Sequence, residues 1–176
     1  MTTILSTKTY DYIIAGSGCA GLSLLYRMLL EPELSNKEIL IIDRETKSKD
    51  DRTWCFWEKS PDIFESVVYH QWQVLDFKSK YFSDELDIRP YTYKMIRGLD
   101  FYNFVYQFAA AYPNVHFMQS KITAMLVTGN QVEVKTPGGT YKAAYAFNST
   151  RLFQPDTRAG EHSLYKIGRA SCRERV

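Results

Sequence analysis

Uninterrupted apolar runs mark two positions near the start of the chain. Ile13, Ile14 and Ala15 follow one another without a polar residue, and EILIID (Glu38–Asp43) repeats this pattern. Such runs are typical of parallel strands that are buried on both faces of a sheet. Between them, residues 19–30 carry apolar side chains at helical spacing, and Pro32 stops the helix. The pattern therefore predicts a strand–helix–strand unit.

Farther along, the pattern predicts a polar loop, a second helix and more strands. We expect TKSKDDRTW to be an excursion loop and residues 50–60 (DDRTWCFWEKS) to belong to the same loop. QWQVLDF and YTYKMIR alternate like strands, and residues 99–112 have one apolar helical face that ends before Pro113. His116 is expected in a strand. Three further strands at 122–127, 132–136 and 140–147, separated by GN and PGG turns, predict a β-meander.

A glycine motif lies between the first strand and the first helix. Gly16, Gly18 and Gly21 form G-x-G-x-x-G, which in this context provides a tight turn, close approach of a pyrophosphate and close helix packing. The helix N-terminus then presents a positive dipole end to phosphates. The acid at the end of the second strand is placed to accept hydrogen bonds from ribose hydroxyls. The predicted cofactor-binding residues of this unit are Gly16, Ser17, Gly18, Cys19, Ala20, Gly21, Asp43 and Arg44. The alternative is a glycine-rich turn in a parallel sheet that binds nothing.

Composition adds limits on class and compartment. The chain is 45% hydrophobic and 24% charged, as in ordinary globular domains. It has no apolar run of the roughly eighteen residues that a membrane span needs, and its N-terminus lacks the pattern of a signal peptide. Three cysteines without metal-ligand spacing favour a reducing, cytoplasmic setting and predict no metal site.

The last ten residues, IGRASCRERV, match the in-frame translation of a common sequencing-library adapter. We therefore expect residues 167–176 to be a non-native tail, the chain to be truncated, and residues 156–166 to be of uncertain structure. The alternative is a basic tail for nucleic acid or anionic lipid. The chain has 22 Lys and Arg and 20 Asp and Glu, and the tail holds three Arg and one Glu, so the remainder is neutral. The charge balance thus gives no reason to expect a nucleic-acid partner.

Two further segments make a family resemblance specific. MIRGLDFYNFV is a strand that ends in Arg97 and enters a helix, and it resembles the strand–Arg–helix element that flanks the flavin in hydroxylase-type FAD enzymes. Together with DYIIAGSGCAGLSLL and DRTWCFWE, it resembles the N-terminal part of bacterial lycopene β-cyclases over about residues 10–155. An acidic motif that this family ties to cyclisation lies farther downstream and is absent here.

The resemblance implies an α/β Rossmann-type FAD-binding fold, with a parallel sheet, a β-meander and part of an antiparallel substrate domain. Residues 1–155 would form an incomplete FAD-binding domain, with the substrate-domain part inserted at about 60–95. The implied reaction is redox-neutral: acid-initiated cyclisation converts the ends of lycopene to β-ionone rings, giving γ-carotene and β-carotene. It requires reduced FAD, with NAD(P)H as the electron source. Lycopene lives in bilayers, so the resemblance also implies peripheral association with a membrane surface.

Candidate site residues follow from this chemistry. Arg97 would meet phosphate or ribitol, or else lie at the surface without a ligand. Trp54, Phe56 and Trp57 would offer π-faces to flavin or polyene, or else pack in the core. The catalytic acid is unknown, and Asp51 and Glu58 are weak candidates. The alternative functions are another FAD-dependent oxidoreductase, of the hydroxylase or polyprenyl reductase type, and a non-catalytic FAD-binding remnant. We expect the 176-residue chain alone to be inactive as a cyclase.

Overall fold

A computed structural model describes residues 9–150 of the protein. Its elements are β1 (Thr9–Ala15), α1 (Cys19–Leu30), β2 (Ile39–Asp43), β3 (Thr53–Glu58), the short 3-10 helix η1 (Glu65–Val67), β4 (His70–Trp72), β5 (Val74–Lys78), β6 (Ser83–Asp87), β7 (Thr92–Arg97), α2 (Gly98–Ala109), β8 (Val115–Gln119), β9 (Ala124–Thr128), β10 (Gln131–Thr136) and β11 (Gly139–Asn148).

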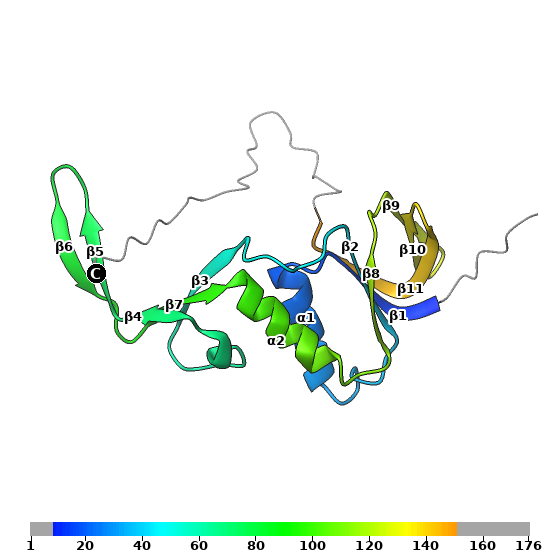
Figure 1. Ribbon diagram of the computed structural model, residues 1–176, viewed down its shortest axis with the longest axis horizontal. Coiled ribbons are helices and arrows are strands. Elements are labelled where there is room, and N and C mark those ends of the chain that lie inside the picture. The colour runs from blue at the N-terminus through cyan, green and yellow to red at the C-terminus, as the bar shows by residue number, and fades with distance from the viewer. Residues whose placement is uncertain (1–8, 151–176) are drawn as a thin grey trace, which may run out of the picture.

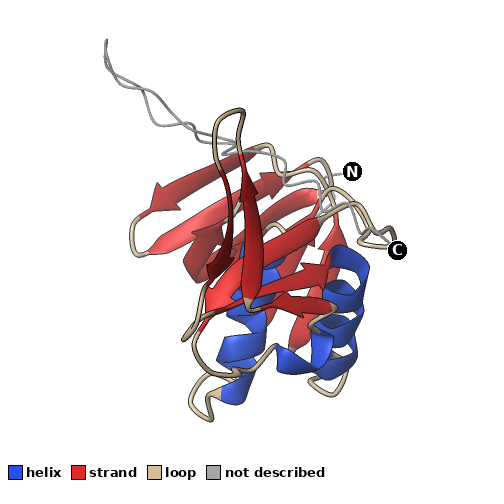
Figure 2. Ribbon diagram, turned by 90° about the vertical axis from the view of Figure 1, so that its left-hand side faces the viewer, coloured by secondary structure: helices blue, strands red, loops and turns tan. Residues whose placement is uncertain are grey.

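A six-stranded sheet forms the centre of the fold, in the order β8-β2-β1-β11-β10-β9. The first four of these strands run parallel, and β10 pairs antiparallel with both β11 and β9. Helices α1 and α2 lie side by side next to this sheet (Figure 1), and Figure 2 shows both on the same side of the strands. The Rossmann-type fold with a parallel sheet and a β-meander is therefore confirmed.

Both faces of the parallel strands are buried, as their apolar runs predict. Ile14, Ile39 and Ile41 face α1 and α2, in a core that also contains Leu25 and Phe101. Side chains of alternate residues point to the opposite face, where a second cluster joins the strands to the meander. That cluster is formed by Tyr10, Ile13, Ala15, Leu40, Ile42, Ile122, Val134 and Ala143.

The chain between β2 and α2 forms two antiparallel units apart from the central sheet. Strands β3, β7 and β4 form a three-stranded sheet, and β5 pairs with β6 in a hairpin. The hairpin projects at the end of the molecule farthest from the β-meander (Figure 1). These units are the antiparallel part that the sequence predicts, although the first strand already begins at Thr53.

The prediction of a single loop over residues 50–60 is wrong, because Thr53–Glu58 is strand β3. Every residue of β3 pairs with one of β7, from Thr53 opposite Arg97 to Glu58 opposite Thr92. The side chains of this strand alternate between two faces: Trp54 and Phe56 pack on the main core, and Trp57 points away from it. The mixture of charged and aromatic residues makes this alternation difficult to recognise in the sequence.

Smaller differences affect element ends. Helix α2 begins at Gly98 and ends at Ala109, three residues before the predicted end. The predicted strand over QWQVLDF is divided at Gln73 into β4 and β5, and β6 was not predicted because its SDELD sequence is polar and exposed. The tail predicted at 167–176 and the uncertain stretch 156–166 lie outside the described residues.

Candidate functional site

The turn between β1 and α1 depends on glycine at two positions. Gly16 has a φ of +100°, and a Cβ atom there would lie 2.5 Å from the hydroxyl oxygen of Ser149. A Cβ atom on Gly21 would lie 1.9 Å from the carbonyl oxygen of Gly16. Both glycines are therefore required by the fold itself, whether or not a ligand binds.

Gly18 differs because no contact among residues 9–150 requires it to be glycine. A Cβ atom built on it has no heavy atom of these residues within 4 Å, and its φ of −80° suits any residue. Gly18 is the N-cap of α1, makes no side-chain capping hydrogen bond, and is followed by a first turn without acidic residues. An open backbone at a helix N-terminus can receive an anion such as a pyrophosphate.

Asp43 connects the end of β2 to this turn. Its Oδ2 accepts hydrogen bonds from the Ser17 backbone N–H (2.7 Å) and hydroxyl (3.0 Å), and its Oδ1 accepts one from the Glu45 N–H (2.9 Å). The Lys47 ammonium lies 3.3 Å from Oδ2. Burial raises the pKa of Asp43, but the hydrogen bonds from Glu45 and Ser17 and the charge of Lys47 together hold it below its usual value. Asp43 is thus a charged anchor of the glycine turn, and its contact with a ribose stays a prediction.

A cleft of about 820 Å³ opens along the carboxyl ends of the parallel strands. Ligands of open α/β sheets bind at this edge. The cleft brings together seven predicted site residues: Gly16, Gly18, Cys19, Asp43, Arg44, Asp51 and Trp54. It is also lined by residues that were not predicted: Ile42, Glu45, Lys47, Arg52, Tyr102, Ser120, Lys121, Ile122, Ser149 and Thr150.

The residues that were missed have a simple signal in common. Ser120 and Lys121 follow β8, and Ser149 and Thr150 follow β11, so they stand at the same sheet edge as Gly16. Ser149 also closes the turn, since its hydroxyl donates to the carbonyl oxygens of Ala15 (2.9 Å) and Gly16 (3.2 Å). The strand order was needed to find them, because the sequence does not show that β11 lies next to β1.

A second cavity, of about 710 Å³, lies on the other side of the loop that follows β2. It shares Asp43, Glu45 and Lys47 with the first cleft, and apolar residues of α2 and β8 line much of it. The Tyr106 hydroxyl in this cavity lies 3.5 Å from the Ser17 hydroxyl, which itself donates to Asp43. Burial raises the pKa of Tyr106, so its phenol stays protonated at neutral pH. A chain of polar groups therefore joins the two cavities.

Arg97 ends β7 and is the N-cap of α2, as predicted, but it does not line either cavity. Its Nε donates to Asp100 at 2.7 Å, and its guanidinium lies 4.1 Å from the centre of the Tyr69 ring. The adjacent Gly98 N–H donates to the Arg52 carbonyl oxygen (2.7 Å), and the Leu99 N–H donates to Asp50 (3.3 Å). The start of α2 thus holds residues 50–52 against the cleft.

Asp51 is the one weak acid candidate that lines the cleft. It accepts a hydrogen bond from the Tyr102 hydroxyl at 3.3 Å, and the Arg52 guanidinium lies 3.5 Å away. Burial, and then the negative charge of Asp51, raise the pKa of Tyr102, so the phenol remains a donor.

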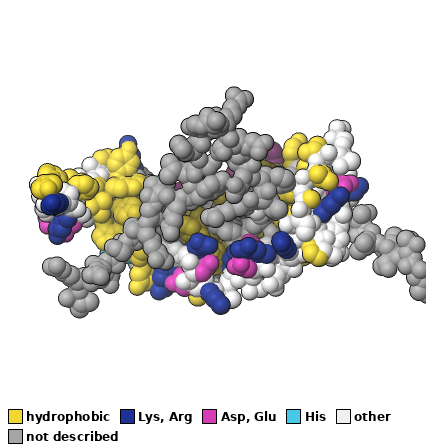
Figure 3. Space-filling model, turned by 90° about the horizontal axis from the view of Figure 1, so that it is seen from above, with side chains coloured by type: hydrophobic (Ala, Val, Ile, Leu, Met, Phe, Trp, Pro, Cys, Tyr) yellow, Lys and Arg dark blue, Asp and Glu magenta, His cyan; other side chains and the backbone are white. Residues whose placement is uncertain are grey.

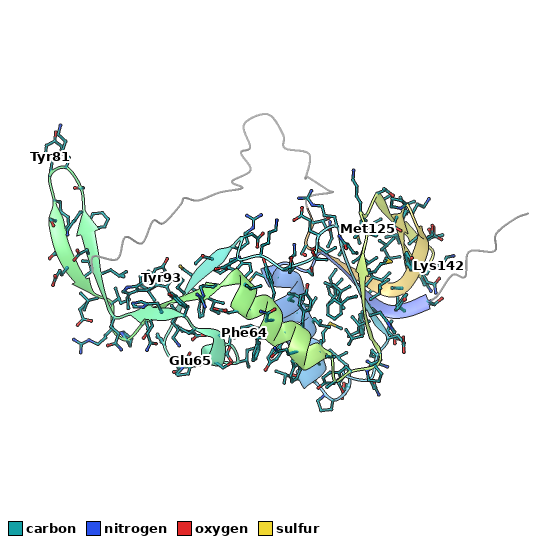
Figure 4. The ribbon with its side chains drawn as sticks, in the orientation of Figure 1. Phe64, Glu65, Tyr81, Tyr93, Met125 and Lys142 are labelled. Atoms are coloured by element: carbon teal, nitrogen blue, oxygen red, sulfur yellow. The ribbon has the colours of Figure 1, made fainter. Side chains whose placement is uncertain are left out.

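Glu58 lies elsewhere, in an ion cluster on the core side of the three-stranded sheet. The Lys94 ammonium is 2.9 Å from Glu58 and also binds Glu65, which comes from η1 (Figure 4). Lys94 is 3% exposed, so burial lowers its pKa, but its hydrogen bonds with Glu65 and Glu58 outweigh burial and raise it. Glu58 thus belongs to a structural ion cluster and lines neither cavity.

The three predicted aromatic contacts point to different places. Trp54 lines the cleft and packs edge-on against Phe101 and Tyr102. Phe56 packs on the core beside it, whereas Trp57 is 52% exposed on the opposite face of the sheet and contacts Tyr93. These three rings therefore cannot surround one ligand together.

No group of His, Cys, Asp or Glu within residues 9–150 is arranged to hold a metal ion. Neither helix in the part of the chain that the structure describes has the length and apolar character needed to cross a bilayer.

Comparison with solved structures shows which known folds the chain resembles. The fold is similar to that of p-nitrophenol 4-monooxygenase PnpA from Pseudomonas putida DLL-E4, with a TM-score of 0.64, 12% identity, and coverage of 79% of this chain and 40% of that one. The fold is also similar to that of PqsL from Pseudomonas aeruginosa, described as a probable FAD-dependent monooxygenase. Here the TM-score is 0.59 and the identity 12%, and the match covers 79% of this chain and 42% of PqsL. For halogenase PltM, in complex with phloroglucinol and FAD, the TM-score is 0.56 and the identity 16%, and the match covers 80% of this chain and 34% of PltM. The chain thus has the α/β fold of FAD-dependent monooxygenases and spans less than half of these relatives.

Sequence comparison then gives the family. Residues 11–168 match the family described as lycopene cyclase protein, and the chain belongs to this family. No curated protein matches the chain significantly.

Proposed function

We propose that the protein binds FAD in the cleft at the carboxyl ends of the parallel strands and acts as a lycopene β-cyclase. The reaction would convert the acyclic ends of lycopene to β-ionone rings, giving γ-carotene and then β-carotene. The observation that carries this proposal is the match of residues 11–168 to the lycopene cyclase family, which agrees with the resemblance seen in the sequence. The activity, the substrate and the partners are all part of the proposal.

The residues present fit FAD. Gly18 leaves open space where a pyrophosphate would approach, and α1 directs the positive end of its dipole to the same place. Arg44 and Lys121 also line the cleft and add positive charge. Asp43 stabilises the glycine turn by accepting hydrogen bonds from the backbone N–H and the hydroxyl of Ser17. When bound and reduced with electrons from NAD(P)H, FAD would supply an electron-rich ring system that stabilises nearby positive charge.

The protein's own residues would then control the proton. Cyclisation starts when a proton adds to the terminal double bond of lycopene, which gives a tertiary cation; the ring closes, and loss of a proton leaves the new double bond. Asp51 lies in the cleft, where it accepts a hydrogen bond from the Tyr102 hydroxyl and lies 3.5 Å from the Arg52 guanidinium. We assign to this carboxyl group the removal of the proton that the cyclised cation loses. Trp54 would shield this part of the cleft from water.

The substrate also sets the cellular location. Lycopene is insoluble in water and resides in membranes, so the protein would act at the cytoplasmic surface of a bilayer as a peripheral protein. Nucleic acid has no part in this proposal.

The activity test uses a complete reading frame that encodes residues 11–150, expressed in cells that accumulate lycopene. We expect β-carotene and γ-carotene, both of the same mass as lycopene. A second candidate function is FAD-dependent oxidation or reduction, which the similarity to monooxygenase structures favours. A product whose mass differs from that of lycopene would support this second function and contradict the cyclase.

The 176-residue chain makes a separate expression test possible. Because we expect the chain to be inactive alone, β-carotene in cells that express only this chain would contradict that expectation, while leaving the cyclase proposal intact.

A further inference from the structure

One face of the three-stranded sheet carries a continuous group of aromatic and sulfur-containing side chains, which we call the aromatic face. Cross-strand partners share a face, and the pairs Trp57–Tyr93, Trp72–Tyr93, Cys55–Met95 and His70–Met95 all belong to this one. It therefore consists of Cys55, Trp57, His70, Trp72, Tyr93 and Met95.

The rings of the aromatic face are in contact with one another. The ring centroids of Trp57 and Tyr93 lie 4.8 Å apart, those of Tyr93 and Trp72 lie 5.8 Å apart, and those of Trp72 and His70 lie 4.4 Å apart. The face thus offers π-surfaces across all three strands, without a Lys, Arg, Asp or Glu among its six residues.

The opposite face of the sheet has the structural role. It holds Lys94 with Glu58 and Glu65, and it packs Trp54 and Phe56 on the core. Figure 4 shows Tyr93 and Glu65 on opposite sides of the sheet, and Figure 3 shows hydrophobic side chains gathered at the surface toward the hairpin end of the molecule. The half-exposed Trp57 is thus not needed to fill the core that its neighbours Trp54 and Phe56 complete.

One end of the aromatic face lies next to a segment that lines the proposed cofactor cleft, although the strand residue in the cleft itself, Trp54, belongs to the opposite face. Thr53 and Arg97 form the next pair of the same register after Cys55–Met95, at the end of the sheet where α2 begins. There the Gly98 N–H binds the carbonyl oxygen of Arg52, which lines the cleft. By this register Arg97 lies at the same end of the face, where it is paired with Asp100 and its guanidinium lies 4.1 Å from the centre of the Tyr69 ring.

We propose that the aromatic face binds the acyclic polyene chain of the substrate across β3, β7 and β4, with Trp57, Tyr93 and Trp72 as the residues that contact it. This inference rests on the proposed function, because the lycopene family supplies the class of ligand. A rigid conjugated chain is flat, apolar and π-rich, and it stacks well on a row of rings without requiring hydrogen bonds.

The experiment uses the purified 176-residue chain and crocetin, an achiral acyclic polyene that dissolves in water as its dianion. Crocetin gains a circular dichroism signal in its visible band only when it is bound in an asymmetric environment. We expect a saturable signal, with a dissociation constant roughly tenfold higher for Trp57→Ala. Trp57→Phe keeps a ring and should bind nearly as well as the unchanged chain.

The matched control is Tyr81→Ala, because Tyr81 is an 87% exposed aromatic residue at the tip of the hairpin and outside the aromatic face (Figure 4). It should leave the crocetin signal unchanged. All variants are compared by far-ultraviolet circular dichroism and melting temperature, so that a folding defect is recognised. If Trp57→Ala fails to fold, Trp72→Leu replaces it with the same expected loss.

An absent signal, or an affinity that Trp57→Ala leaves unchanged, overturns the inference. So does sedimentation that shows a self-associated chain without a crocetin signal, because the face would then bind a second copy. FAD titration of the same samples separates the two proposals. If FAD binds and crocetin does not, the aromatic-face proposal fails and FAD binding stands. If crocetin binds and FAD does not, the proposal of FAD binding fails and the aromatic-face proposal stands.

Discussion

The backbone N–H of Ser17 donates a 2.7 Å hydrogen bond to Oδ2 of Asp43, which ends the neighbouring strand 26 residues later. The Ser17 hydroxyl donates to the same oxygen, and Lys47 lies beside it. The carboxylate that the sequence assigns to ribose recognition thus already stabilises the glycine turn. A change at Asp43 should therefore affect folding as well as cofactor affinity.

We expect Asp43→Asn to lower the free energy of unfolding by about 1–2 kcal/mol at pH 7, because charge-assisted hydrogen bonds are lost. The folded-state pKa of Asp43 is lowered, so its contribution is present above the usual Asp value of about 4 and is lost as the pH falls through the folded-state pKa. Urea unfolding between pH 3 and pH 7 measures this. The control is Asp76→Asn on the exposed hairpin, and a difference from the unchanged chain that does not depend on pH would contradict the role given to Asp43.

The roles of Gly18 and Gly21 in the glycine motif should separate experimentally. Gly21→Ala places a Cβ atom 1.9 Å from a backbone oxygen, so we expect a loss of about 3 kcal/mol of stability. Gly18→Ala meets no protein atom and should cost about 1 kcal/mol or less, yet weaken FAD binding roughly tenfold or more by obstructing the pyrophosphate.

Thermal melting and FAD titration give the two readouts for the glycine variants. Gly138→Ala is the control, since its added Cβ would meet only the Thr136 hydroxyl at 3.8 Å. If a folded Gly18→Ala variant kept the full affinity for FAD, the prediction that the pyrophosphate binds beside Gly18 would be wrong.

Gly98 allows the segment that carries Asp51 to approach α2. A Cβ atom there would lie 2.8 Å from the Arg52 carbonyl oxygen, which accepts a hydrogen bond from Gly98. We expect Gly98→Ala to cost about 1–3 kcal/mol and to weaken FAD binding, because residues 51 and 52 line the cleft. Chemical denaturation followed by FAD titration of the folded fraction tests this, and an unchanged stability would show that the segment is free to move aside.

The Lys94 cluster should contribute stability without contributing to cofactor binding. Lys94→Met removes the cation between Glu58 and Glu65, so we expect a loss of about 2–3 kcal/mol at pH 7, less than for fully buried pairs because both carboxylates are partly exposed. Because the folded-state pKa of Lys94 is raised, its contribution is fully present below the usual Lys value of about 10 and is lost as the pH rises through the higher folded-state pKa.

The loss caused by Lys94→Met should therefore shrink at a pH above the folded-state pKa of Lys94, where the amine of the unchanged chain is neutral. Guanidinium unfolding at several pH values measures this loss of stability. Glu65→Gln should lower the free energy of unfolding by less than Glu58→Gln, because the Glu65 side chain is the more exposed of the two. A variant as stable as the unchanged chain at pH 7 would contradict the role of this cluster.

The sequence predicts the parts of the fold whose signals are local. The apolar runs around Ile14 and Ile41, the glycine turn and the meander turns each carry their own pattern, and the structure has them within a few residues. Strand β3 was missed because aromatic residues occur on both of its faces, so the sequence shows no apolar–polar alternation. Only the pairing with β7 shows that Trp54 and Phe56 face the core and Trp57 does not.

The site could be predicted only in part, for a related reason. Gly18 and Asp43 lie within one local unit, so their neighbourhood follows from the motif. Tyr102 and Ser149 reach the cleft through long-range packing that no short stretch of sequence encodes. The separation of Asp51 from Glu58 likewise depends on strand register, which places the second on the core side with Lys94.

The most direct test of the cofactor site is an FAD titration of the purified 176-residue chain, followed by flavin fluorescence anisotropy, with Gly18→Ala measured in parallel. Saturable binding of one FAD per chain, weakened roughly tenfold in the variant, is the expected result. A chain that melts cooperatively but leaves the flavin anisotropy unchanged would contradict the assignment of this cleft to FAD.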